Sequence, residues 1–239
     1  MTLNTPLDKP RLPTPVSSPI SISEFREIAT TSSGRVILLM RHAERPKIQE
    51  NDSTFGEDLG LTESGSIQAH QCGTLLAGMD CCSFGASPMR RTRETAKNIA
   101  SGMGLKDVSI FDAPEIGVSG LWVEDRELLH SYYQKEGSAV CTDRYFRDGY
   151  AEGYRTIQEG TALTFDWLTQ TDFGARRTFI ISHDIFIAAL LQGLGVRRFS
   201  SQEWLGYLQS AALVEDSDGT WKAFYCVPDK DKFGNIFIQ

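Results

Sequence analysis

The chain has 239 residues, of which 41% are hydrophobic and 23% charged, so it is long enough for one sizeable globular domain. Its formal net charge of -7 argues against nucleic acid or an anionic membrane as the main partner. No apolar run approaches the ~20 residues that span a bilayer, so we expect no membrane segment.

The first 20 residues are rich in proline, serine and threonine, which predicts an extended or disordered N-terminal arm. They lack a basic start followed by an apolar stretch, so they do not resemble a secretory signal. The five cysteines are odd in number and include no CxxC pair, which favours reduced thiols. We therefore expect a cytoplasmic protein with a single domain over residues 21–239.

The first strong signal is an apolar run at residues 36–40, which predicts a strand buried on both faces of a parallel sheet. It leads directly into Arg41, His42, Glu44 and Arg45. Ligands of open α/β sheets bind beyond the carboxyl ends of strands, so these side chains mark a candidate site. Arginine offers paired donors to phosphate oxygens, and neutral histidine can attack phosphorus. The alternative interpretation is a strand end with solvated charges.

Further elements follow in chain order. We expect a polar loop at residues 46–60 that borders the site, and a helix that begins after Thr62 with Ile67 facing inward. A weak strand precedes residue 87, and basic residues, among them Arg91, begin the next helix, where free N–H groups attract anions. A second apolar strand at residues 178–181 ends in His183 and Asp184.

The remaining segments complete the predicted fold. Residues 123–170 contain aromatic and charged residues in helical runs. A capped helix is expected from residue 200, and residues 216–219 predict a hairpin turn between two strands. Together these elements predict a three-layer α/β/α sandwich with a mostly parallel central sheet and an antiparallel edge strand.

Four segments resemble, in the same order, motifs of the histidine phosphatase superfamily, also called phosphoglycerate-mutase-like proteins. Residues 41–44 resemble its RHG/RHA motif and residues 61–69 its LTxxGxxQA segment. Residues 87–96 resemble SPxxRTxETA, and residues 181–184 resemble the second-histidine motif. The resemblance implies that His42 is the nucleophile and that Arg41, Arg45, Arg91 and His183 bind phosphate. It also implies that the helical insertion at 123–170 lies near the site and covers it.

The proton donor has two candidates. Asp184 directly follows His183, which resembles the HD motif of the acid-phosphatase branch. Glu115 lies in a segment that resembles the EIxxGxWEG segment of the mutase-like branch, with one residue inserted. The closer match favours Asp184, although neighbouring arginines lower the pKa of a carboxyl group and so disfavour its acid form.

The sequence therefore predicts a metal-independent phosphatase that hydrolyses a phosphomonoester through a phosphohistidine on His42. Two alternatives are a phosphoglycerate-mutase-like phosphoryl mutase and a non-catalytic phosphate-binding regulatory module. No HxH or HExxH motif occurs and no cysteines stand at zinc-ligand spacing, so we expect neither metal nor cofactor. The expected partner is a small phosphorylated substrate, and the oligomeric state stays open.

Overall fold

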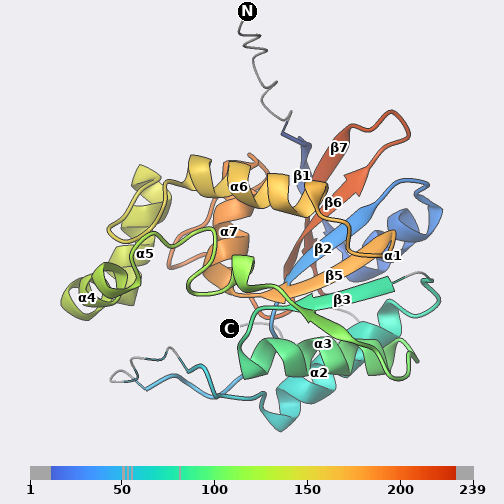
Figure 1. Ribbon diagram of the computed structural model, residues 1–239, viewed down its shortest axis with the longest axis horizontal. Helices are drawn as coiled ribbons and strands as arrows, with labels where there is room; N and C mark the ends of the chain where they lie inside the picture. The colour runs from blue at the N-terminus through green and yellow to red at the C-terminus, as the bar shows by residue number, and fades with distance from the viewer. Residues whose placement is uncertain (1–11, 50–51, 53, 55, 81, 230–239) are drawn as a thin grey trace, which may run out of the picture.

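The computed structural model describes residues 12–49, 52, 54, 56–80 and 82–229, so the first eleven residues of the predicted arm lie outside the described residues. Within the described part, the strands form one seven-stranded sheet in the order β1-β7-β6-β2-β5-β3-β4. Helices cover both faces of this sheet (Figure 1). The three-layer α/β/α fold and the mostly parallel sheet are thereby confirmed.

The carboxyl ends of the central strands meet at one edge of the sheet. β2 pairs in parallel with β5, and β5 pairs in parallel with β3. Arg41, the last residue of β2, is the register partner of Ser182, which ends β5. The strands are β1 (Thr14–Ser21), β2 (Val36–Arg41), β3 (Cys82–Ala86), β4 (Ile110–Asp112), β5 (Arg177–Ser182), β6 (Ser210–Glu215) and β7 (Trp221–Val227).

The helices divide between the two faces of the sheet. β2 is buried throughout, as its continuous apolar run predicts, and its alternate residues face two different cores. Ile37 and Leu39 pack beneath α4 (Arg126–Glu136), α5 (Ser138–Asp148), α6 (Ile157–Gln170) and α7 (Asp184–Gly193). Val36, Leu38 and Met40 pack on α1 (Ile22–Thr31), α2 (Glu63–Leu75) and α3 (Arg90–Gly102). None of the described helices is long and apolar enough to cross a membrane.

The predicted position of the antiparallel strand is wrong. The strand that runs antiparallel is β6, and it lies inside the sheet between β7 and β2. The hairpin does not form the edge because β1 adds to the outer side of β7, in parallel. Since β1 begins at Thr14, the sheet includes residues that we expected to belong to an arm outside the domain.

Two local predictions also differ from the structure. Ser200 accepts a hydrogen bond from the Glu203 amide at 3.2 Å, as a helix cap would, but no helix follows because the chain turns inward and buries Leu205. On α2, Ile67 is 52% exposed rather than buried. Helix α2 packs instead through glycines: a Cβ on Gly65 would lie 2.2 Å from the Glu44 carbonyl oxygen.

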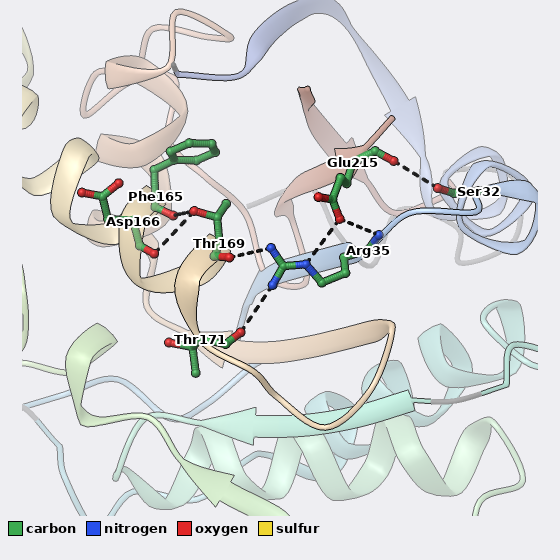
Figure 2. Close-up of polar contacts among 7 residues, drawn as sticks. All are labelled: Ser32, Arg35, Phe165, Asp166, Thr169, Thr171 and Glu215. Carbon is green, nitrogen blue, oxygen red and sulfur yellow. Dashed lines mark hydrogen bonds and ion pairs between the residues drawn. The ribbon is translucent and has the colours of Figure 1, made fainter. Parts of the chain in front are cut away.

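The amino end of β2 is fastened by Arg35, far from the carboxyl edge of the sheet (Figure 2). Arg35 Nη2 donates to the Thr169 carbonyl at 2.5 Å and Nη1 to the Thr171 carbonyl at 3.4 Å. Carbonyls at the end of a helix lack partners within it, so these bonds satisfy the end of α6. Arg35 also pairs with Glu215 through Nε at 3.3 Å, which connects β6 to the same point.

Candidate active site

Three side chains with hydrogen-bonding or nucleophilic groups follow the carboxyl ends of adjacent parallel strands. His42 comes after β2, His183 after β5 and Ser87 after β3. Helices α3 and α7 begin at the same edge. A cavity of about 460 Å³ opens there, and we call it the active-site cavity. Five of the predicted site residues line it: His42, Arg45, Arg91, His183 and Asp184.

The hydrogen bonds of His42 determine which ring nitrogen is free. Its Nδ1 lies 2.8 Å from the Ala43 carbonyl oxygen, and a carbonyl can only accept, so Nδ1 carries the proton. The lone pair of the neutral ring is therefore on Nε2. Burial, together with the charges of His183, Arg41 and Arg91, holds the pKa of His42 well below its ordinary value. His42 is thus a neutral imidazole with a basic Nε2.

The backbone around His42 is fixed from two sides. Its own amide donates to the Ser182 carbonyl at 3.1 Å, which continues the pairing of β2 with β5. The next amide, of Ala43, donates to Thr95 Oγ1 on α3 at 3.0 Å. Because strand and helix both hold this short segment, the imidazole is positioned before any ligand binds.

A chain of hydrogen bonds orients His183. Arg91 Nη2 lies 3.4 Å from Nδ1, so Nδ1 accepts and Nε2 donates to Ser87 Oγ at 2.8 Å. Ser87 Oγ lies 3.1 Å from Thr92 Oγ1, which in turn donates to backbone carbonyls. Burial, with the charge of Arg91, lowers the pKa of His183 to about 3. The two imidazole rings lie 5.6 Å apart, centre to centre, in an edge-on arrangement.

The three predicted arginines leave donors unpaired at this edge. The Nε atoms of Arg41, Arg45 and Arg91 are buried and have no hydrogen-bond partner in the described part of the chain. A buried unpaired donor costs about 1–3 kcal/mol, more when charged, so an oxyanion that accepts from these groups would be stabilised. Arg91 remains a cation at neutral pH, since burial and Arg45 lower its pKa only to about 10.

Arg41 and Asp184 are paired with each other. Arg41 Nη2 lies 2.8 Å from Asp184 Oδ2, and Nη1 donates to the Leu205 carbonyl at 2.5 Å. Asp184 Oδ2 also accepts from the Trp204 indole at 3.1 Å. Burial raises the pKa of Asp184, but Arg41, Trp204 and His183 together hold that pKa below its ordinary value. Asp184 is therefore a carboxylate at neutral pH.

Glu115, the other candidate acid, lies apart from this group. It occupies a short 3₁₀ turn, Pro114–Ile116, and is half-buried, but its side chain does not line the active-site cavity. Its backbone carbonyl accepts from the Leu121 amide at 2.7 Å, which closes the following turn. Among the described lining residues, Asp184 is the one that carries a carboxylate.

The predicted helical insertion forms one wall of the active-site cavity. Leu129 and Tyr133 of α4, with Ala139 and Thr142 of α5, line it. Figure 1 shows α4 and α5 at the end of the molecule beyond α7, outside the sheet itself. Side chains from this segment therefore line the same cavity as the two histidines.

Tyr207 and Trp204 are site residues that the sequence did not indicate. The Arg41 guanidinium lies 4.3 Å from the centre of the Tyr207 ring, and that ring lies 5.9 Å from the ring of His42. Both aromatic residues come from the irregular segment before β6. Neither belongs to a motif or a periodic run, so the only available signal was an aromatic residue in a loop.

No cluster suited to a metal is found in the described residues: no three His, Cys, Asp or Glu side chains gather as a metal site would require. The groups that surround the two histidines are arginines, hydroxyls and one carboxylate. Such a donor set suits an oxyanion rather than a cation.

Comparison with known families agrees with this arrangement. The sequence profile of the histidine phosphatase superfamily (branch 1) matches residues 37–219, which is more than half of the chain. The chain belongs to the histidine phosphatase superfamily. Sequence comparison with curated proteins finds no match.

Solved structures with this fold include both mutases and phosphatases. A phosphoglycerate mutase from Bacillus anthracis strain Sterne superposes with a TM-score of 0.55 at 14% identity, covering 87% of this chain and 98% of that chain. A mycobacterial glucosyl-3-phosphoglycerate phosphatase gives 0.51 at 15% identity, covering 82% and 100%. At these identities the likeness establishes the histidine phosphatase fold, and the activity has to be argued from the site.

Proposed function

We propose that this member of the superfamily is a phosphatase that hydrolyses a phosphomonoester through a phosphohistidine on His42. The observation that carries the proposal is the hydrogen bond from His42 Nδ1 to the Ala43 carbonyl, which leaves Nε2 unprotonated. A buried imidazole with a lowered pKa keeps that lone pair at neutral pH. The substrate would be a small phosphorylated molecule that enters the active-site cavity.

The reaction proceeds in two displacements. Nε2 of His42 attacks phosphorus in line with the ester oxygen, so that an N–P bond forms as the P–O bond breaks and the alcohol leaves with a proton. Water then attacks the phosphohistidine, gives up a proton, and releases phosphate with neutral His42. In this proposal Arg41, Arg45 and Arg91 lie around the transferred oxygens and stabilise their charge, and His183 donates its Nε2–H to them in place of Ser87.

We propose Asp184 as the group that delivers and later accepts the proton. Its position among the lining residues supports this role, whereas Glu115 does not line the active-site cavity. The ion pair with Arg41 favours the ionised form of Asp184. A bound phosphate dianion adds negative charge nearby, which raises the pKa of the carboxyl group and favours the acid form.

Trapping of the intermediate tests the proposal. The protein is mixed with a ³²P-labelled aryl phosphate, quenched in alkali, in which phosphohistidine survives, and assayed for label and for released phosphate. Wild type should carry label and release phosphate, and His42→Asn should do neither. His70, which is exposed on α2, provides the matched control, and His70→Asn should behave like wild type. Label on His42→Asn would overturn the proposal.

The same assay separates the alternatives. A phosphoryl mutase would return label to an added alcohol or sugar phosphate in preference to water. A non-catalytic binding module would retain phosphate without turnover in wild type as well as in His42→Asn. Release of inorganic phosphate in excess of enzyme, without transfer to an acceptor, is the outcome that we expect.

A further inference from the structure

The active-site cavity is larger than a phosphate group needs, and much of its remaining wall is formed by apolar side chains. Val118 and Leu129 line it from the insertion side, Ile185 and Phe186 from the first turn of α7, and Trp204 from the segment before β6. A volume of about 460 Å³ is within the range of sites that enclose a small organic ligand as well as its anionic group.

Most polar side chains of this wall are hydrogen-bonded within the protein, and Ser138 lies at an exposed position. Tyr133 and Tyr154, whose hydroxyls are 3.1 Å apart, form a pair. Ser201 Oγ donates to Asp143 at 2.7 Å. No asparagine or glutamine is among the described lining residues, and the carboxylate of Asp184 already accepts from Arg41 and Trp204. Arg126 lines the cavity from an exposed position, so its charge remains in contact with solvent.

The apolar side chains and the scarcity of free polar groups disfavour a sugar in this space and favour an apolar group. The hydroxyls of a sugar would leave water and find few free partners, and an unpaired buried hydroxyl disfavours binding. An apolar organic group would lose no hydrogen bonds to water, and burial of each CH₂ group would increase the binding constant about fourfold. The aromatic residues of the wall also suit the face or edge of a ring.

We propose that the substrate is a phosphate monoester of an aromatic, largely apolar alcohol rather than of a sugar or another polyol. This inference rests on the proposed phosphatase activity and specifies what occupies the space beside the transferred phosphate. The apolar wall would contribute to selectivity through the organic group, while the arginines and histidines bind the phosphate common to all candidates.

The test uses three primary alkyl phosphates, so that leaving-group chemistry stays nearly constant: 2-phenylethyl phosphate, ethyl phosphate and glucose 6-phosphate. We expect kcat/KM for 2-phenylethyl phosphate to exceed that for ethyl phosphate about 10- to 100-fold, as burial of a phenyl group predicts. Glucose 6-phosphate should be no better than ethyl phosphate. Equal values for the phenylethyl and ethyl esters, or a preference for glucose 6-phosphate, would overturn the inference.

Two variants test whether the apolar residues that line the cavity cause the preference for the phenylethyl ester. Val118→Asn, on a half-buried loop residue, and Leu129→Asn should each reduce the phenylethyl-to-ethyl ratio several-fold. Leu128→Asn is the matched control, because Leu128 is the neighbouring residue on α4 but is 44% exposed and does not line the cavity. The ratio is measured within one preparation, so any loss of folded protein cancels. A ratio that stays at the wild-type value in both wall variants contradicts the inference.

Failure of the underlying activity gives a different result. If wild type releases no phosphate from any of the three esters or from phenyl phosphate, the proposed phosphatase activity is wrong. The inferred substrate class is then wrong as well. If phosphate is released at similar rates from all three alkyl phosphates, the phosphatase activity is supported. Only the inference about the apolar wall is then overturned.

Discussion

Asp184 is ion-paired with Arg41, so under the proposed function its protonation would respond to the charge that a phosphate substrate brings. One carboxyl oxygen accepts from the Ile185 amide at 2.9 Å, and the other accepts from Arg41 and Trp204. These donors stabilise the carboxylate and disfavour the acid. A dianionic phosphate that draws Arg41 toward itself would weaken this stabilisation at the moment when a proton is needed.

Substitution of Asp184 by asparagine tests this role. The amide keeps the size of the side chain and an acceptor oxygen but cannot deliver a proton. We expect Asp184→Asn to slow hydrolysis of alkyl phosphates about 10²–10⁴-fold, the usual size of general acid catalysis. Aryl phosphates with good leaving groups should be affected far less, because their alcohols leave without a proton. The measurement is kcat/KM against leaving-group pKa for both proteins.

Glu115→Gln is the matched control for that series. Because Glu115 does not line the active-site cavity, this variant should lose little activity toward either class of ester. If sensitivity to the leaving group increases in Glu115→Gln and not in Asp184→Asn, the proton comes from Glu115.

The buried histidines make stability depend on pH. In the folded state the pKa of His183 is about 3 and that of His42 is also lowered, whereas both are near 6.5 when unfolded. The unfolded state therefore binds more protons below pH ~6.5, and the free energy of unfolding falls as pH falls through that range. At pH 5 the loss from His183 alone is roughly 2 kcal/mol by this linkage.

Urea unfolding of wild type and His183→Gln at pH 8 and pH 5 measures the effect. Glutamine cannot be protonated, so the decrease between the two pH values should be smaller in the variant than in wild type. His70→Asn, at an exposed position, should leave the decrease as in wild type. An equal decrease in wild type and His183→Gln would show that the acid sensitivity arises elsewhere.

Most residues of the candidate site could be predicted because each lies in a short local pattern. His42 and His183 directly follow continuous apolar strands, and Arg91 stands in the first turn of an amphipathic helix. Tyr207 and Trp204 could not be predicted in the same way. They reach the site through an irregular segment whose path is fixed by distant contacts, such as the bond from the Leu208 amide to the Arg41 carbonyl at 3.2 Å.

At the scale of secondary structure, Arg35 connects α6, β2 and β6 without contacting the site (Figure 2). Replacement by methionine keeps the aliphatic part of the side chain but leaves the end of α6 unsatisfied. Since Arg35 is about one-third exposed, we expect Arg35→Met to lower the free energy of unfolding by only about 1–2 kcal/mol. Values of kcat/KM should stay within about twofold of wild type.

Arg147→Met is the matched control, because the exposed Arg147 pairs only with its neighbour Asp148 among the contacts that the described residues form. Its free energy of unfolding should change by less than about 0.5 kcal/mol. Loss of activity in Arg35→Met at unchanged stability would mean that this end of β2 influences the site directly.

Elements with strong periodicity were predicted, and those set by long-range pairing were not. Strands β2 and β5 form at the two apolar runs, and Thr62 caps α2 as expected. By contrast, the outer edge of the sheet beyond β7 is formed by β1, whose residues are largely exposed and include prolines. Such a segment has neither the alternation nor the composition that identifies a strand.

At the scale of the whole molecule, the hydrophobic cores on the two faces of the sheet support different parts of the candidate site. The core beneath α1, α2 and α3 packs the side of the sheet from which Thr95 and Arg91 reach the site. The core beneath α6 and α7 continues into α4 and α5, which line the substrate end of the active-site cavity. Under the proposed function, Arg91 would bind phosphate from one face of the sheet, and α4 and α5 would contact the organic group from the other.

The two edges of that sheet also bear on how copies of the chain behave toward each other. One edge is β4, which has only three residues, and the other is β1, in which Pro15 and Pro19 lack an amide donor. Short or proline-containing edges cannot easily template a further strand from another molecule. Removal of β1 would expose β7, seven residues long, as an open hydrogen-bonding edge. Because β1 covers β7 with a strand that contains two prolines, we expect the sheet to be a poor template for strands of another copy of the chain.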